Sequence, residues 1–203
     1  SFYRFVLQRP TKFKYCFCSK TLGKFIRMHW KMHSYCIAST VKYLEQLWEK
    51  LPESPLDDAL ANWMIRECIC EKREHDALRI LSLQFQITCG FEQVGLSIFQ
   101  LLAAFQRSNN KKAIVQICQM TLEKIRAADK SDFIPAKLAT ILIRNLAFFH
   151  CCPKNLSVLG EIFDKVQEKD SILIANLLKA YVKFGACSEI ISLFRQFPAL
   201  ATH

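Results

Sequence analysis

The chain has 203 residues, of which 51% are hydrophobic, and it contains only 5 Gly and 6 Pro. This length is enough to bury a core, and the scarcity of Gly and Pro excludes a turn-rich β-sandwich, a Gly-rich nucleotide-binding fold and a disordered chain. The formal net charge of +10 favours a polyanionic partner. The stretch that comes nearest to a membrane span, residues 138–149, is interrupted by Arg144 and Asn145, so we expect no membrane association.

The start of the chain and its cysteines indicate the compartment. Residues 1–10 lack the apolar core of a signal peptide, and because the chain begins without Met we expect an excised domain of a longer protein. The 10 cysteines are too scattered for a disulfide scaffold, which favours a reducing, intracellular location in the cytoplasm or nucleus. We expect most of the later ones to be small buried side chains, namely Cys68, Cys70, Cys89, Cys118, Cys151, Cys152 and Cys187.

The net charge is concentrated at the N-terminal end. The segment 1–42 contains nine basic residues and no acidic residue, whereas the rest of the chain has nearly equal numbers of both and is close to neutral. Aromatic residues are interleaved with the basic ones, and this combination is typical of proteins that bind single-stranded nucleic acid. We predict that the phosphates are contacted by Lys12, Lys14, Lys20, Lys24, Arg27 and Lys31. We predict base stacking on Tyr15, Phe17 or Trp30. The alternatives are an acidic protein partner and a solvated basic face without a partner.

The same segment contains a candidate zinc site. Cys16 and Cys18 precede His29 and His33, and the two histidines are four residues apart, so both imidazoles lie on one face of a helix. Residues 15–33 resemble a C2H2 zinc finger, and the resemblance implies one zinc ion held by these four side chains. One residue separates the cysteines instead of two or more, and the stretch to the first histidine is shorter than the usual length of about twelve. The alternative is a metal-free helix in which both histidines are ordinary amphipathic residues.

From residue 37 onward the chain reads as consecutive amphipathic helices. Apolar residues recur at helical spacing, as in Val41, Leu44 and Trp48, and prolines, glycines and short polar runs separate the segments. The predicted helices span residues 37–51, 56–71, 74–88, 91–107, 110–128, 134–150, 155–168, 171–184 and 188–197. The sequence therefore predicts an all-α fold with a basic segment at 1–36 followed by a helical domain at 37–203.

These helices also repeat in pairs. Residues 177–185 read Leu-Leu-Lys-Ala-Tyr-Val-Lys-Phe-Gly and precede a second helix, which resembles the pentatricopeptide repeat family. The resemblance implies an α-solenoid of stacked helical hairpins; tetratricopeptide-like and HEAT-like repeats, and another α-bundle, remain alternatives. The first interval between second-helix anchors fits such a hairpin, whereas the later intervals need an insertion and a deletion. The anchors are Ala77, Ala113, Leu159 and Ile190.

The repeats themselves are not expected to read bases. In the pentatricopeptide family a polar residue near the start of the first helix contacts a base. The resemblance assigns that position to Asn62, Ile98 and Ala175, of which only the first is polar. We therefore expect the helical array to dock a partner protein.

No catalytic signature is present. The chain contains no Gly-rich phosphate loop, nucleophile elbow or HExxH motif. The sequence therefore predicts a non-enzymatic interaction scaffold of a larger protein associated with nucleic acid, RNA in particular, with contact through the basic segment. The alternative is an adaptor that binds only protein.

Overall fold

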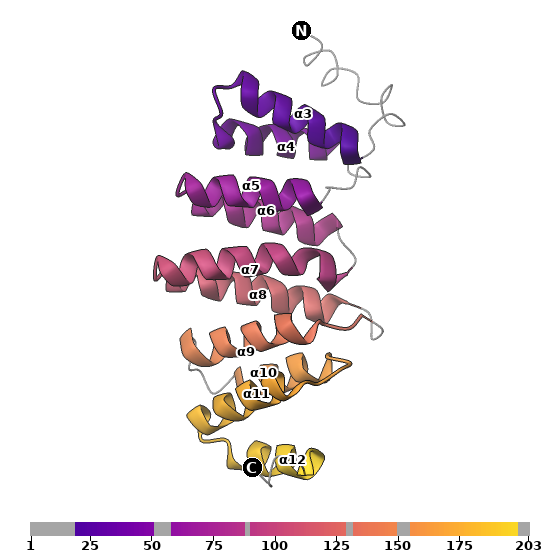
Figure 1. Cartoon of the computed structure of the whole chain (residues 1–203), viewed down its shortest axis with the longest axis vertical. Coiled ribbons are helices and arrows are strands. Elements are labelled where there is room, and N and C mark those ends of the chain that lie inside the picture. Colours follow the sequence, from indigo (N-terminus) through magenta and orange to yellow (C-terminus); the bar gives the residue numbers. More distant parts are fainter. Residues whose placement is uncertain (1–18, 51–57, 88–89, 129–131, 150–154, 199–203) are drawn as a thin grey trace. The chain divides into compact units, whose positions relative to one another are not determined.

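The computed structural model describes residues 19–50, 58–87, 90–128, 132–149 and 155–198. These ranges contain ten α-helices and no β-strand, so the all-α prediction is confirmed (Figure 1). The helices are α3 (Ser19–Met32), α4 (Ile37–Lys50), α5 (Asp58–Cys70), α6 (Glu74–Ile87), α7 (Phe91–Arg107), α8 (Lys111–Ala127), α9 (Ala136–Phe149), α10 (Asn155–Asp164), α11 (Ser171–Phe184) and α12 (Cys187–Gln196). In the described part of the chain, no helix is long and apolar enough to cross a membrane.

The nine predicted helices from α4 onward are present, with most ends within two residues of the prediction. The largest difference is at α10, which ends four residues early, at Asp164. The chain leaves the helix there because the carbonyl of Lys165 accepts a hydrogen bond from the backbone N–H of Ile134, with N and O 2.9 Å apart. This hydrogen bond between the segment before α9 and the end of α10 thus takes the place of a further turn of α10.

The helices belong to two compact units. The first contains α3 to α6 and residues 96–101 of α7, and the second contains residues 90–95 and 102–107 of α7 together with α8 to α12. The expected division between residues 36 and 37 falls inside the first unit, in the turn that joins α3 to α4.

Four turns between paired helices share one hydrogen-bond pattern. In each turn a residue with positive φ follows the first helix: Ser34 (φ 54°), Lys72 (55°), Asn109 (52°) and Gly185 (66°). The next backbone N–H donates to the carbonyl five residues earlier, as in a Schellman motif, in the pairs Tyr35–Trp30, Arg73–Cys68, Asn110–Phe105 and Ala186–Tyr181. The first three of these turns follow one another at nearly equal intervals along the sequence, and the fourth comes after twice that interval.

The start of the second helix can be compared among these turns by its first helical hydrogen bond. In each hairpin this bond joins a backbone N–H of the second helix to a carbonyl four residues earlier, at the end of the turn. The donor–acceptor pairs are Thr40–Cys36, Ala77–Arg73, Ile114–Asn110 and Ile190–Ala186. By this hydrogen-bond pattern Ile114, rather than its neighbour Ala113, occupies the position in its turn that Ala77 occupies in the preceding one. Ala113 instead donates its N–H to the Asn110 side chain, which caps α8.

The core of the first unit is mainly apolar and includes a polar cluster around Ser97. Ile26, Leu44 and Ile65 are completely or almost completely buried. The hydroxyl of the buried Ser97 in α7 lies 2.6 Å from Gln84 Oε1 and 3.0 Å from Asn62 Oδ1. The Asn62 carboxamide, to which the repeat resemblance assigns base contact, is therefore engaged in packing between α5 and α7.

In the second unit α9 occupies a central position and packs against α8, α10 and α11. Its residues Leu138, Leu142 and Ile143 are fully buried, as is Leu173 of α11. This burial of one side of each helix is what the 3.6-residue periodicity of the sequence requires.

Replacing Ile143 by Ala should destabilise this unit through loss of apolar burial and creation of a cavity. We expect a loss of about 2–5 kcal/mol in the free energy of unfolding, measured by urea denaturation followed by circular dichroism. Ile191→Ala is the matched control, because Ile191 is 53% exposed, and should cost less than about 1 kcal/mol. Equal losses in the two variants would contradict the assigned core.

Candidate nucleic-acid interface

The predicted site residues divide into two groups. Six of them lie outside the described residues, namely Lys12, Lys14, Tyr15, Cys16, Phe17 and Cys18. The others belong to α3, or follow it directly, namely Lys20, Lys24, Arg27, His29, Trp30, Lys31 and His33. The interface is therefore built here from α3 and its neighbours.

A basic face extends along α3. Lys24, Arg27 and Lys31 are exposed, and their spacing of three and four residues places them on one side of the helix. Lys20 continues the same spacing one turn earlier in the sequence. The helix contains no acidic residue, and in the described ranges none of the three exposed cations has an ion-pair partner. We refer to Lys24, Arg27 and Lys31 as the α3 basic face.

The opposite side of α3 holds the helix in place. Ile26 has no exposed surface, and His29 is only 3% exposed. Burial of these residues against α4 explains why the segment is helical although it contains Gly23, which disfavours helix formation. The amphipathic pattern thus turns the cations outward.

An aromatic cluster adjoins the basic face. The Trp30 ring makes edge contacts with Tyr35, at 4.6 Å between centroids, and with Trp63 of α5, at 5.1 Å. The Arg27 guanidinium carbon lies 5.8 Å from the centroid of the Trp63 ring, a cation–π distance. Trp30 is half-buried within this cluster, and Tyr35 is 56% exposed. Tyr35 and Trp63 are therefore added to the candidate site.

Sequence reasoning missed the role of Trp63 because it lies in a different helix, far from Arg27 along the chain. No local spacing connects the two residues, and only the packing of α3 near α5 brings them together. Tyr35 is one of the aromatic residues of the basic segment, and the structure places it in the turn after α3, with a positive φ of 62°.

The two histidines of the predicted zinc set lie together. The His29 ring stacks on His33 at 4.1 Å and on Tyr43 of α4 at 4.4 Å, and its Nδ1 lies 3.5 Å from Thr40 Oγ1. Burial, followed by the neighbouring His33, lowers the pKa of His29 to about 4. The imidazole is therefore neutral at pH 7, as both a packed core residue and a metal ligand require.

The described residues do not include the cysteines of that set. Within the ranges that the structure describes, no group of three or more His, Cys, Asp and Glu side chains is placed to hold a metal ion. His29 contributes to packing between α3 and α4, as the metal-free alternative requires. The zinc alternative further requires Cys16 and Cys18, which lie outside these ranges.

The later cysteines are only partly as expected. Cys68 and Cys118 are buried, and desolvation raises the pKa of each thiol to about 12, so both are protonated and behave as apolar side chains. Cys70 and Cys187 are exposed, contrary to expectation, because they lie in the last and first turns of their helices, beyond the buried stripe.

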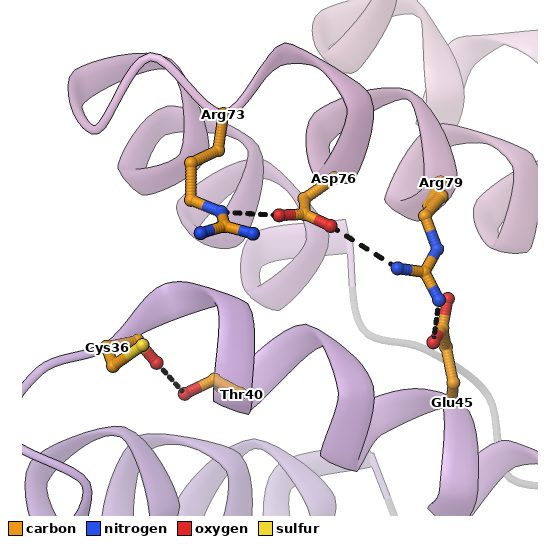
Figure 2. Close-up of polar contacts among 6 residues, drawn as sticks. All are labelled: Cys36, Thr40, Glu45, Arg73, Asp76 and Arg79. Atoms are coloured by element: carbon orange, nitrogen blue, oxygen red, sulfur yellow. Dashed lines mark hydrogen bonds and ion pairs between the residues drawn. The ribbon is translucent and has the colours of Figure 1, made fainter.

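The first unit also has a face on which charges are paired, shown in Figure 2. Asp76 of α6 accepts from Arg73, and it lies 3.4 Å from a guanidinium nitrogen of Arg79. Arg79 also pairs with Glu45 of α4. Hydrogen bonding to Asp76 raises the pKa of Arg73. These cations are neutralised by neighbouring carboxylates, which distinguishes them from the α3 basic face.

Comparisons with known proteins identify no relative of this chain. No protein-family model matches the chain, and no curated protein or solved structure matches it significantly.

The buried His29 should make stability depend on pH. Because its folded pKa of about 4 is below its unfolded value of 6.5, protonation favours the unfolded chain. The contribution of neutral His29 is present above pH 6.5 and is lost as the pH falls from 6.5 toward 4. We expect a smaller decrease in the free energy of unfolding over this range for His29→Leu than for the parent, measured by urea denaturation with a chelator present.

His75→Gln is the control for this measurement, because His75 is a histidine on α6, away from the His29 cluster. It should retain the pH dependence of the parent over the interval from 6.5 to 4. The same decrease in the parent and in His29→Leu would show that His29 is not held in its neutral form.

Proposed function

We propose that the chain is a non-enzymatic helical-repeat scaffold, part of a larger nucleic-acid-associated protein, that contacts single-stranded RNA through α3. The observation that carries this proposal is the α3 basic face: three exposed cations without acidic partners in the described residues, next to an aromatic cluster. Arg73 and Arg79 of the same unit are less suited to this role, because carboxylates already neutralise them.

The chemistry of such a face suits a nucleic-acid strand. Unpaired Lys and Arg side chains replace condensed counterions along the phosphates, and the release of those counterions supplies affinity that decreases with salt. Aromatic rings beside the cations offer stacking surfaces that accept any base. In this interface Tyr35, which is 56% exposed, is better placed for stacking than Trp30, which is half-buried between Tyr35 and Trp63.

The recurrence of one turn at nearly equal intervals supports the helical-repeat part of the proposal. Repeats of pentatricopeptide or tetratricopeptide type use such hairpins to present a surface to a partner, here proposed to be a protein. The base-contact positions assigned by the resemblance argue against a base-reading code, because Ile98 is buried and Asn62 is engaged by Ser97.

The exposed thiols support an intracellular setting for this activity. Cys36, Cys70 and Cys187 are free and exposed, a state that a reducing cytoplasm or nucleus maintains. The competing proposal is an adaptor whose basic face binds an acidic protein segment rather than RNA.

Charge reversal on the basic face tests the RNA assignment. The variant Lys24→Glu/Arg27→Glu/Lys31→Glu should bind a fluorescein-labelled mixed-sequence single-stranded RNA at least about tenfold more weakly, measured by fluorescence anisotropy. The slope of log affinity against log salt should decrease in magnitude by about 2, since three phosphate contacts at about 0.7 each are lost. Helix content should be unchanged, because all three side chains are exposed.

The matched control is Lys111→Glu/Lys112→Glu/Arg195→Glu, which makes the same change of net charge at exposed positions on α8 and α12. It should keep most of the RNA affinity. Undiminished binding by the α3 variant would overturn the assignment, and displacement of the RNA by an equally charged polyglutamate peptide would favour the adaptor.

The zinc hypothesis has a separate test. A finger formed by Cys16, Cys18, His29 and His33 predicts one zinc ion per chain after purification without chelator, and its loss in Cys16→Ser/Cys18→Ser. Elemental analysis of both proteins measures this directly. Zinc well below one equivalent in the parent would remove the hypothesis and leave the metal-free helix.

A further inference from the structure

A second candidate site is a hollow in the second unit. It has a volume of about 410 Å³, in the range of small-molecule sites, and is lined mainly by α9 and α11. Its lining includes three cations, three carboxamides and one aromatic ring, namely Arg144, Lys179, Lys183, Gln106, Asn145, Asn176 and Phe148. In the described part of the chain, no acidic residue lines it.

Among the described residues, no carboxylate forms an ion pair with the cations of this hollow. The sequences of α9 and α11 contain basic residues but no Asp or Glu. In the part of the chain that the structure describes, Arg144 and Lys179 have no ion-pair partner. Lys183 contacts the Phe148 ring, with its ammonium nitrogen 4.8 Å from the centroid. Three positive charges around one hollow repel one another, and a bound anion would offset that repulsion.

Phe148 gives the hollow a stacking surface. This side chain is 71% exposed, the largest exposure among the large hydrophobic residues of the described ranges. An exposed ring beside cations suits a nucleobase, because the base can stack on the ring while its phosphates reach the cations. An acidic peptide would use the charges but gain little from the ring.

Hydrogen bonds hold the carboxamides of Asn145 and Asn176, the amide side of the hollow, in position. Asn145 is 2% exposed; its Nδ2 donates to the carbonyl of Ile141, and its Oδ1 accepts from Gln106 Nε2, both at 2.8 Å. Asn176 donates through Nδ2 to the carbonyl of Ile172 at 2.7 Å. That bond orients the Asn176 carboxamide, and within the described ranges its Oδ1 accepts no hydrogen bond. It is available to a base amino group.

We propose that this hollow binds one nucleotide unit of a single nucleic-acid strand. The base stacks on Phe148, and the flanking phosphates contact Arg144, Lys179 and Lys183. This inference rests on the proposed function and deepens it, because it adds a second contact in the other compact unit. The site could not be recognised from net charge, because the chain after residue 42 is nearly neutral. Its acidic residues lie outside α9 and α11, so the charge of these two helices is positive.

The test uses the full chain and a fluorescein-labelled mixed-sequence RNA of about 12 nucleotides, within the site sizes of single-strand binders. Arg144→Glu/Lys179→Glu/Lys183→Glu should weaken binding at least about tenfold and reduce the magnitude of the salt slope by about 2. The control Lys111→Glu/Lys112→Glu/Arg195→Glu should bind much like the parent. Circular dichroism verifies that helix content is retained in each variant.

A second variant tests stacking without changing charge. Phe148→Leu should weaken RNA binding about tenfold and leave the affinity for an abasic strand of equal length unchanged. Equal effects on both strands would overturn the assignment of a base to this ring.

The outcomes separate the two proposals. Parent-like binding by the Arg144/Lys179/Lys183 variant, with weakened binding by the α3 variant, overturns the second site alone. The reverse result supports the hollow and overturns the α3 interface. Failure of the parent to bind RNA overturns both, and equally effective competition at the hollow by a polyglutamate peptide assigns it to an acidic peptide instead.

Discussion

Each helix of this protein must bury one apolar stripe, and this requirement governs where every charged side chain can lie. On α3 the buried Ile26 and His29 face α4, so Lys24 and Arg27 must face outward. The tight turns with a positive-φ residue keep paired helices adjacent in the chain, so that each stripe meets its neighbour without a long connection. Burial therefore creates the exposed cationic surfaces as a direct consequence of packing.

Several polar side chains inside the packing form hydrogen bonds with one another across helices. Ser97 joins Gln84 and Asn62 in the first unit, and Asn145 pairs with Gln106 in the second. A buried amide or hydroxyl without a partner costs about 1–3 kcal/mol, so these pairs favour one register between neighbouring helices. In the second unit the same pairing orients the amide side of the hollow, which links the stability of the fold to the geometry of the proposed site.

Charge is distributed unevenly among the helices, and this is the common basis of both proposed contacts. α3, α9 and α11 carry no acidic residue, whereas α4 and α6 carry the carboxylates that neutralise Arg73 and Arg79. Each unit then has cations beside an aromatic ring that form no ion pair with the described residues, around Trp63 in one and Phe148 in the other. Electrostatic attraction to a polyanion at these places would be local and sensitive to salt.

The sequence alone determined the helices from residue 37 onward and the concentration of cations in the segment 1–42, because amphipathic periodicity and charge are local properties of the chain. The structure decided that residues 19–32 form one helix with Lys24, Arg27 and Lys31 exposed. Only the tertiary structure placed Trp63 beside Arg27, engaged Asn62 with Ser97 and ended α10 at Asp164, since these depend on contacts between distant segments. The hollow was likewise invisible in the sequence: Phe148 and Lys183 belong to different helices, and packing of α9 against α11 brings them together.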